Sequence, residues 1–185
     1  MWEDRFAQEG YLFGTDPVPF LLKHGPLFQK GQSVLSIAEG EGRNGVHLAK
    51  LGLNVTGVEF APSAIAKARK LAKQNEVDVK FLQSDLFQWN WPSNSFDITL
   101  GIFFQFVGPD QRNLLWRRML EATRPGGLIM IHGYTPKQLQ FGTGGPPCVE
   151  NMYTRECFDE VFGDCKIFAY DEYEAEQRSG SAHVG

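Results

Sequence analysis

Features that would decide the class of this protein at once are scarce or missing from its 185 residues. No apolar run approaches the roughly 20 residues that a helix needs to cross a bilayer. Residues 1–5 lack the basic stretch and apolar core of a secretory signal, and the chain has no internal repeat, low-complexity tract or interdomain linker. We therefore expect a cytoplasmic protein without a membrane partner, folded as a single domain over residues 1–185.

Positive charge is also in short supply, because 18 Lys and Arg face 22 Asp and Glu, for a formal net charge of −4. A nucleic-acid binder needs a basic face to release counterions from phosphates, so we expect no nucleic-acid partner.

Cysteine is rare and odd in number, and the spacing of Cys148, Cys157 and Cys165 matches no CxxC metal site. We expect reduced thiols and no bound metal.

What the sequence does contain is a regular alternation of short apolar runs and amphipathic stretches. The predicted strands are residues 33–38, 54–59, 79–83, 96–104 and 128–132, then 166–173 and a last strand at 181–185. The predicted helices are residues 17–29, 44–51, 61–75, 109–123 and 155–161. Such alternation implies right-handed crossovers and a mainly parallel sheet. We predict an α/β, Rossmann-like three-layer sandwich around a seven-stranded sheet, whose last strand is either truncated or a short edge strand.

The segment between the first predicted strand and its helix is rich in glycine. Gly40, Gly42 and Gly45 have the spacing of a dinucleotide-binding loop, where glycines let the backbone approach a ligand closely. This spacing alone would also suit an NAD(P)-dependent oxidoreductase. Glu39 and Glu41, however, flank Gly40, where carboxylates would oppose a pyrophosphate. S-adenosylmethionine (SAM) has no phosphate and carries a positive sulfonium and a positive amino group, so the acidic loop favours SAM.

Two further carboxylates follow the next two predicted strands. Glu59 ends the second strand, 19 residues after Gly40, where it can accept hydrogen bonds from both ribose hydroxyls. NAD enzymes share this feature, so it does not separate the two cofactors. Asp85 follows the third strand and can bind the adenine amine, with Leu86 against the ring. The alternative for Asp85 is a turn or helix cap.

Several short motifs together indicate a family. They are residues 2–6 (WEDRF) with 10–15 (GYLFGT), the loop 39–44 (EGEGRN), Asp85 with Leu86, residues 124–127 (RPGG), 134–136 (YTP) and 142–146 (GTGGP). With these motifs the chain resembles the class I SAM-dependent methyltransferases over nearly its whole length. Within that class it is similar to the small bacterial enzymes of the tellurite-resistance and thiopurine-methyltransferase-like group.

The resemblance implies a cofactor site and an acceptor side. Residues 38–40 would line the methionine part of SAM, and residues 103–105 after Ile102 would face the acceptor. Residues 1–30 would form a lid and helix segment over the site. Apart from the resemblance, residues 135–150 are rich in glycine and follow the fifth predicted strand, so we expect an acceptor-side loop that acts as a lid, with a fixed crossover as the alternative. The residues expected to bind the cofactor are Tyr11, Gly14, Ala38, Glu39, Gly40, Gly42, Arg43, Asn44, Glu59, Phe60, Asp85, Leu86 and Ile102.

The sequence departs from the family pattern at four positions. Many members have an acidic residue where Ser36 stands and glycine where Ala38 stands. Relatives often have His near Gln105 and Glu where His132 stands. Gln105 and His132 are nevertheless the two candidates for a catalytic role, and His132 has the alternative of a strand-end histidine bonded to backbone.

Methyl transfer from a sulfonium is an in-line displacement in which the protein mainly orients and desolvates the reactants. No base is needed for a thiolate or a reduced chalcogen, whereas a base would help a hydroxyl or ring nitrogen. We predict a SAM-dependent methyltransferase that acts on a small molecule, such as a thiol or a chalcogen oxyanion, and releases S-adenosylhomocysteine (SAH). We expect a monomer or weak homodimer. The alternatives are an NAD(P)-binding oxidoreductase, opposed by Glu41, the PGG motif and the lack of a Tyr-x-x-x-Lys pair, and a non-catalytic SAM-binding domain.

Overall fold

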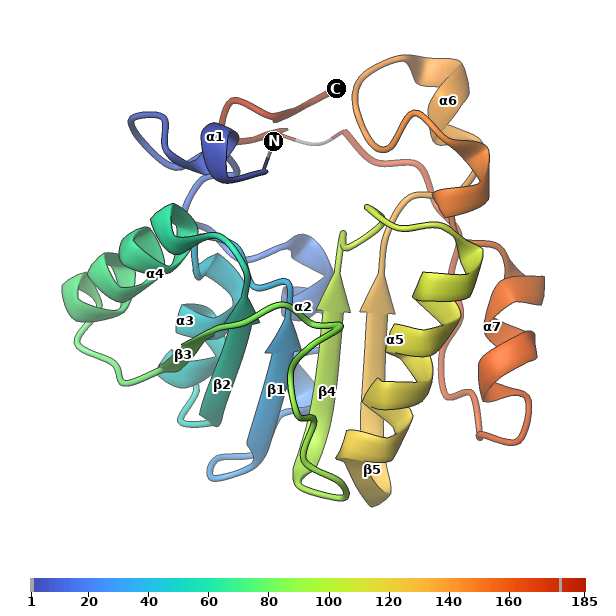
Figure 1. Ribbon diagram of the computed structural model, residues 1–185, viewed down its shortest axis with the longest axis horizontal. Coiled ribbons are helices and arrows are strands. Elements are labelled where there is room, and N and C mark those ends of the chain that lie inside the picture. Colours follow the sequence, from blue (N-terminus) through green and yellow to red (C-terminus); the bar gives the residue numbers. More distant parts are fainter. Residues whose placement is uncertain (1, 177) are drawn as a thin grey trace.

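The computed structural model describes residues 2–176 and 178–185, and its centre is a parallel β-sheet (Figure 1). The strands run in the order β3-β2-β1-β4-β5, and every neighbouring pair is parallel. The chain therefore builds the sheet outward from β1 in one direction and then returns to add β4 and β5 on the other side. The strands are β1 (Ser33–Ile37), β2 (Asn54–Glu59), β3 (Lys80–Gln83), β4 (Phe96–Ile102) and β5 (Thr123–His132).

Helices cover both faces of this sheet. Side chains alternate along a strand, so Val34 packs with α2 and α3, whereas Leu35 and Ile37 pack against α5 on the opposite face. The helix α4 lies on the same side as α3, over β2 and β3. The helices are α1 (Trp2–Phe6), α2 (Pro19–Lys23), η1 (Gly25–Leu27), α3 (Arg43–Lys50), α4 (Pro62–Gln74), α5 (Pro109–Ala122), α6 (Gln138–Phe141), η2 (Val149–Asn151) and α7 (Arg155–Phe162).

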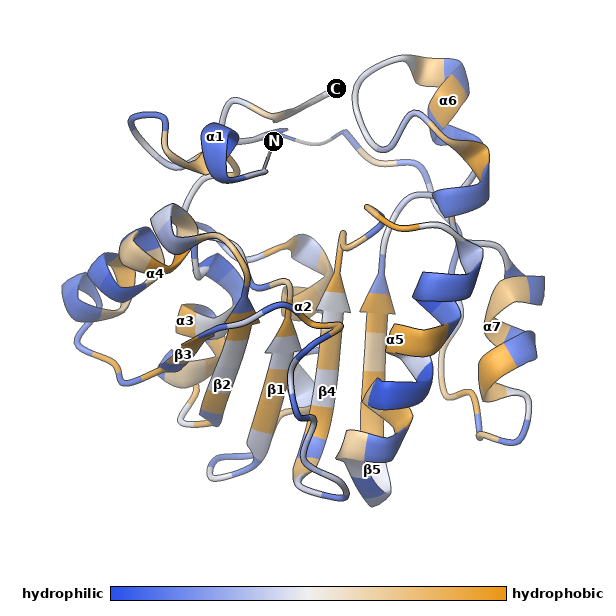
Figure 2. Cartoon of the chain, viewed as in Figure 1, coloured by the Kyte–Doolittle hydropathy of each residue, from blue (hydrophilic) through white to orange (hydrophobic). Residues whose placement is uncertain are grey.

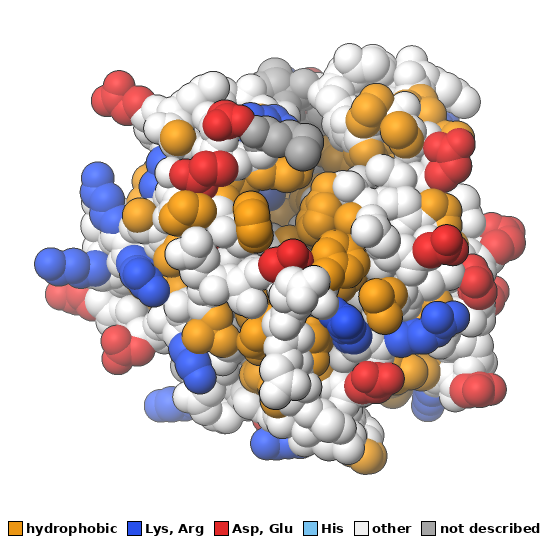
Figure 3. All heavy atoms as spheres, in the orientation of Figure 1, with side chains coloured by type: hydrophobic (Ala, Val, Ile, Leu, Met, Phe, Trp, Pro, Cys, Tyr) orange, Lys and Arg blue, Asp and Glu red, His pale blue; other side chains and the backbone are white. Residues whose placement is uncertain are grey.

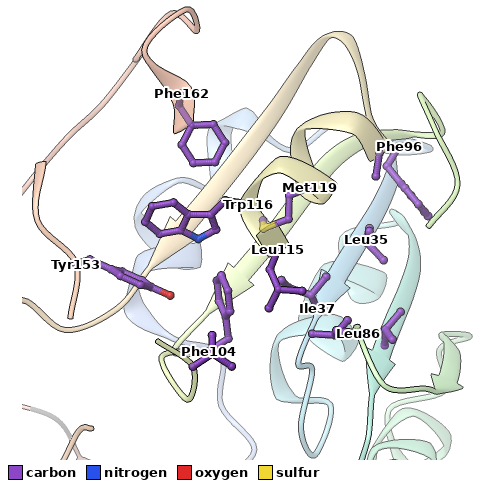
Figure 4. Close-up of a cluster of buried hydrophobic side chains, with 13 residues drawn as sticks. Leu35, Ile37, Leu86, Phe96, Phe104, Leu115, Trp116, Met119, Tyr153 and Phe162 are labelled. Atoms are coloured by element: carbon purple, nitrogen blue, oxygen red, sulfur yellow. The ribbon is translucent and has the colours of Figure 1, made fainter. Parts of the chain in front are cut away.

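The largest single cluster of the core lies between the sheet and the α5–α7 layer. Trp116 of α5 is fully buried there, its ring stacked on Phe158 of α7 at 4.7 Å between centroids. Figure 4 shows Trp116 among side chains from β1, β4 and the helices. Hydrophobic residues recur along the strands, whereas the helices are hydrophobic on one side and hydrophilic on the other (Figure 2). That pattern is the one expected of a parallel sheet covered on both faces.

The predicted fold class is confirmed, with five strands in the main sheet where the sequence suggested seven. Residues 166–173 have an apolar pattern, but a strand also needs a hydrogen-bonded neighbour, and in the described chain this segment is irregular. The last predicted strand is shorter than residues 181–185. It consists of β7 (His183–Val184), which pairs antiparallel with β6 (Arg178–Ser179) outside the main sheet.

Three predicted boundaries moved for identifiable reasons. The helix expected at residues 17–29 ends at Lys23 and is followed by the one-turn η1, because Gly25 and Pro26 interrupt the α-helical hydrogen bonds. The strand β4 ends at Ile102 because Phe103 adopts a positive φ of 53°. The loop expected at residues 135–150 contains α6 and the start of η2.

The two ends of the chain meet above the carboxyl ends of the strands (Figure 1). The carbonyl oxygen of Leu12 accepts hydrogen bonds from the backbone N–H groups of Ser181 and Ala182, at 3.0 and 3.1 Å. Together these segments lie over the edge of the sheet where a parallel α/β fold places its ligands. No helix in the described part of the chain is long and apolar enough to span a membrane.

Candidate functional site

The residues predicted to bind the cofactor come from adjacent strand ends. The register pairs Ile37 of β1 with Val58 of β2 and with Gly101 of β4, so these three strands end side by side. Glu59 pairs with Gln83 of β3, two residues before Asp85. The strand order therefore places Asp85, Glu59, the glycine loop, Ile102 and His132 in one row along the carboxyl edge of the sheet.

The glycine loop turns sharply between β1 and α3. Gly40 and Gly42 have φ values of +63° and +90°, which glycine adopts without strain. A Cβ on Gly42 would lie 2.8 Å from the Cβ of Ala68, so glycine lets the loop pack directly on α4. Ala38 also has a positive φ, of 47°, which costs an L-residue roughly 1–2 kcal/mol. It stands where the family often has glycine.

Glu39 is buried beneath the loop. The Ser36 hydroxyl donates to one of its carboxylate oxygens, and the Gly45 backbone N–H donates to the other at 2.6 Å. A Cβ on Gly45 would lie 2.6 Å from that second oxygen, which explains the third glycine of the motif. Burial raises the pKa of Glu39 to about 7, and the nearby charge of Glu59 acts in the same direction.

The other side chains of the loop hold the N-terminal segment. Glu41 pairs with Lys67 of α4 at 2.8 Å and accepts the backbone N–H of Phe13 at 3.4 Å. Arg43 donates to the Phe13 carbonyl at 2.8 Å, and Asn44 accepts the N–H of Val18 at 3.1 Å. The segment over the site is thus attached to the loop through its backbone.

The sequence analysis placed Glu39 and Glu41 beside the ligand on either side of Gly40, and the structure shows which groups their carboxylates contact in the protein. Both side chains are buried, and both carboxylates accept hydrogen bonds from the protein itself. The hydrogen-bonding capacity of both carboxylates is therefore largely used within the protein. Tyr11 and Gly14 do lie in the segment above the loop, and the Tyr11 hydroxyl donates to the Lys67 carbonyl at 3.2 Å.

Glu59 and Phe60 form the part of the row that suits a nucleoside. One carboxylate oxygen of Glu59 accepts the Gly40 N–H, and the other accepts the N–H groups of Phe60 and Ala61, all at 2.9 Å. A carboxylate has about four acceptor positions, so Glu59 retains capacity for a ribose hydroxyl. Phe60 is 64% exposed, which leaves its ring available to a base. These groups fit an adenosine moiety.

Asp85 and Leu86 differ in their placement. Asp85 accepts the N–H of Phe87 at 2.8 Å, which is the turn cap considered as the alternative for this residue. That bond uses Oδ1 only. The side chain of Leu86 packs in the core with Ile37 and Val58. On the described geometry, Leu86 thus contributes its side chain to the core.

Beyond the glycine loop, Ile102 and Gln105 are both buried. The Ile102 side chain packs with Val18 and Leu21 on the α2 face of the sheet. The Gln105 amide donates to the carbonyls of Tyr134 and Asn151, at 2.8 and 3.1 Å, and accepts the Tyr134 N–H at 2.6 Å. Its amide is therefore occupied in holding the chain after β5.

His132, at the end of β5, stands among aromatic rings. It stacks on Phe20 at 4.8 Å with an interplanar angle of 12°, and it meets Phe103 edge-on at 4.9 Å. Burial lowers the pKa of His132 to about 4, helped by nearby His24 and Arg43. The sequence analysis considered a hydrogen bond to the backbone as the alternative role of this histidine. The bond that the structure shows involves the backbone carbonyl of His132, which accepts the Phe103 N–H at 2.8 Å.

A cavity of about 380 Å³ opens beside His132, between the ends of β4 and β5 and residues 171–176. Hydrophobic side chains surround a hollow on this edge of the molecule (Figure 3). Tyr134 and Tyr173 line the cavity, and the sequence analysis assigned neither of them a role. In the sequence, Tyr134 stood out only as part of the 134–136 motif. Tyr173 comes from an irregular segment, and no local sequence pattern determines where such a segment lies.

Another cavity, of about 340 Å³, lies away from the strand ends, between α4 and β3.

The fold and the row of strand-end groups define a Rossmann-like domain built for an adenosyl cofactor. The family model described as "Methyltransferase domain" matches residues 34–127, and the chain belongs to this family. It is a class I methyltransferase domain, and the cofactor of its class is SAM. The predicted family and cofactor are thereby confirmed, and the NAD(P) alternative falls away.

Named relatives agree with this assignment. A ubiquinone/menaquinone biosynthesis C-methyltransferase, UbiE, from Bdellovibrio bacteriovorus is 29% identical over 158 residues, covering 82% of this chain and 63% of the relative. The structure of TehB from Haemophilus influenzae matches with a TM-score of 0.69 at 18% identity, over 85% of this chain and 54% of that one. A SAM-dependent methyltransferase from Geobacter sulfurreducens in complex with SAH has a TM-score of 0.59 at 18% identity, over 70% and 53%. The chain spans less than two thirds of the length of the curated relatives it matches first.

Proposed function

We propose that this protein transfers a methyl group from SAM to a small-molecule acceptor bound in the cavity beside His132. The observation that carries the proposal is the order of groups along the carboxyl edge of the sheet. Nucleoside-binding groups lie at β2 and β3, the glycine loop lies at β1, and the cavity opens at β4 and β5. A cofactor held along this row would present its methionine end toward the cavity.

The cavity also has a suitable size and position. Its volume of about 380 Å³ lies within the usual range for sites that bind small molecules. The relative from Bdellovibrio bacteriovorus is named for quinone biosynthesis, which supports a small acceptor for this chain too. That no nucleic acid binds, that the protein is a monomer or weak homodimer, and that it is cytoplasmic stay predictions from the sequence.

The protein's own residues have modest chemical tasks in such a reaction. When bound, SAM supplies an electrophilic methyl group on a sulfonium that is already a good leaving group. Glu59 would hold the ribose, and Phe60 and Asp85 would flank the adenine. Gln105 would position the walls of the acceptor site by holding Tyr134. Catalysis would then come from orientation and exclusion of water, without a required base.

Calorimetric titration of SAM and SAH tests this function, with NAD as a control ligand. Wild-type protein should bind both in the micromolar range and NAD not at all. Glu59→Gln should weaken SAM binding by about tenfold or more, because a charge-assisted hydrogen bond to ribose contributes about 1.5–3 kcal/mol. Glu121→Gln, an exposed carboxylate at the end of α5, is the matched control and should bind normally.

Formation of SAH in the presence of candidate acceptors then separates an enzyme from a non-catalytic SAM-binding domain. Thermal unfolding of the Glu59→Gln variant must accompany the titration, because Glu59 also accepts three backbone hydrogen bonds. A folded wild-type protein that binds neither SAM nor SAH would reject the proposal. Binding without turnover on any acceptor would favour the non-catalytic domain.

A further inference from the structure

The walls of the cavity beside His132 are aromatic. The Phe103 ring lies 4.9 Å from the His132 ring and 4.8 Å from the Tyr134 ring, measured between centroids. The Tyr173 ring lies 6.2 Å from His132 and is inclined to it by 18°. Faces and edges of four rings from β4, β5 and residues 171–176 therefore converge on one space. Such a site favours a flat, apolar molecule, and aromatic faces also attract cations.

His132 joins this wall as an uncharged ring at neutral pH, because burial holds its pKa near 4. It therefore offers no positive charge to an anion. The nearby Arg43 is buried and donates to the Phe13 carbonyl, next to the carboxylates of Glu39 and Glu41. The positive charge of Arg43 is thus already matched within the protein.

The rim of the cavity is acidic. Lys23, Lys137 and Arg178 pair with three of the rim carboxylates, and each of these six side chains is at least half exposed. Four carboxylates face three cations, so the rim has an excess of negative charge. Because exposed ion pairs are weak and screened by solvent, the three pairs do not hold these carboxylates firmly. The four carboxylates belong to Asp171, Glu172, Glu174 and Glu176.

We propose that the methyl acceptor is a small aromatic base, whose uncharged nitrogen takes the methyl group and becomes cationic. This inference rests on the proposed function and names its substrate class. The nitrogen lone pair forms the new N–C bond while the S–C bond breaks and its electron pair stays on sulfur. The positive charge passes to nitrogen, and where the nitrogen carried a hydrogen, that proton is released to solvent.

Positive charge therefore develops inside the aromatic, acid-rimmed cavity as the reaction proceeds. Interactions that strengthen with this charge lower the barrier, since they are stronger in the transition state than in the ground state. An anionic acceptor is neutralised by methylation, so it gains no cationic charge for the cavity to stabilise, and it must first approach the acidic rim. The charge of the cavity thus disfavours the chalcogen oxyanion suggested by the sequence, and it disfavours a thiolate for the same reason.

Three flat probes of similar size test the inference: N-methylquinolinium as a cation, quinoline as a neutral base, and quinoline-carboxylate as an anion. Each is titrated by calorimetry into protein saturated with SAH. The cation should bind about tenfold or more tightly than the anion, given the usual strength of cation–π contacts and rim attraction. Equal or tighter binding of the anion would overturn the inference.

Substitutions at the rim provide the second measurement. Combining Glu172→Gln with Glu174→Gln should weaken N-methylquinolinium binding about three- to tenfold and leave quinoline binding unchanged. Glu121→Gln, at the other end of the sheet, should affect neither probe. Unchanged cation affinity in the rim variant would contradict the inference.

Turnover with SAM supplies the third measurement, with quinoline, thiophenol and selenite as competing acceptors. Methylation of quinoline nitrogen should exceed methylation of the other two. If thiophenol or selenite is methylated instead, the acceptor class is wrong and the methyltransferase function stands. If SAH itself does not bind, the proposed function has failed and not the acceptor class alone.

Discussion

Among single residues, Glu39 has the most unusual environment. Where many family members carry an acidic residue, this chain has Ser36, and the carboxylate instead comes from Glu39 three residues later. The two side chains are hydrogen-bonded to each other, and Gly45 leaves room for the displaced carboxylate. A buried carboxylate is costly when ionised, so this arrangement ties stability to pH.

The sign of the pH effect follows from the raised pKa. The folded protein holds the Glu39 proton up to about pH 7, whereas the unfolded chain releases it near the ordinary value of 4.5. The folded state therefore binds more protons between these values, and the stability falls as the pH rises through this window. Glu39→Gln keeps the shape without an ionisable group, because its amide oxygen can accept the Gly45 N–H and its NH2 group can donate to the Ser36 hydroxyl oxygen. Its stability relative to wild type should rise by about 3 kcal/mol across the window.

Urea denaturation of both proteins at pH values from about 5 to 8 measures this difference. Parallel profiles for the two proteins would mean that Glu39 does not titrate in the folded state near neutrality. Ser36→Ala is a useful companion, because it removes the hydroxyl that donates to the carboxylate. It should raise the pKa of Glu39 further and extend the fall in stability to higher pH.

At the scale of elements, one buried ion pair joins α4 to the glycine loop and, through Glu41, to the N-terminal segment. Glu41 is almost fully buried, and its partner Lys67 also donates to the Gln8 carbonyl at 2.7 Å. Removing only the lysine would leave a buried carboxylate without its cation, which is more damaging than losing both charges.

A double-mutant cycle tests this coupling. Lys67→Met should destabilise the protein by about 2–4 kcal/mol, and adding Glu41→Gln should recover part of that loss. Amide hydrogen exchange at Phe13 should become faster in Lys67→Met, because its N–H bonds Glu41. Lys70→Met, an exposed lysine on the same helix, is the control and should behave like wild type. Additive single effects would show that the pair does not act as a unit.

The elements themselves were largely readable from the sequence, because their signals are local. Gly40 and Gly42 mark the first turn, and the pattern from residue 33 to residue 132 gives all five strands of the sheet in order. The segment 166–173 was misread because apolar alternation says nothing about whether a pairing partner is present. The aromatic setting of His132 was equally out of reach, since Phe20, Phe103 and Tyr173 come from three distant parts of the chain.

The same limit applied to the charges of the loop. Their residue types were read correctly as features of the loop, but their directions depend on Lys67 and on the space left by Gly45. The sequence led to the right family through its motifs, because a motif is recognised by residue types and spacing and not by the directions of the side chains.

At the scale of the whole molecule, the two ends of the chain cover the edge of the sheet that holds the proposed site (Figure 1). Where the two ends meet, their backbones approach each other closely. A Cβ on Gly180 would lie 2.4 Å from the Leu12 carbonyl oxygen and 2.5 Å from the Gly14 nitrogen. Gly14 and Gly180 both have positive φ values, of 72° and 60°. A ligand bound beneath these segments would leave more slowly while they remain together.

Gly180→Ala should therefore speed the release of bound SAH, because the added methyl group pushes residues 179–182 away from Leu12. A loss of about 1 kcal/mol in this contact corresponds to roughly a fivefold faster dissociation, which stopped-flow displacement can resolve. Gly10→Ala is the matched control: Gly10 also has a positive φ, of 80°, yet its added Cβ would meet nothing within 4 Å. It imposes the same kind of backbone strain without separating the segments. Faster release in Gly180→Ala alone would show that the paired chain ends retain the cofactor, and equal rates in all three proteins would place the cofactor's exit path elsewhere.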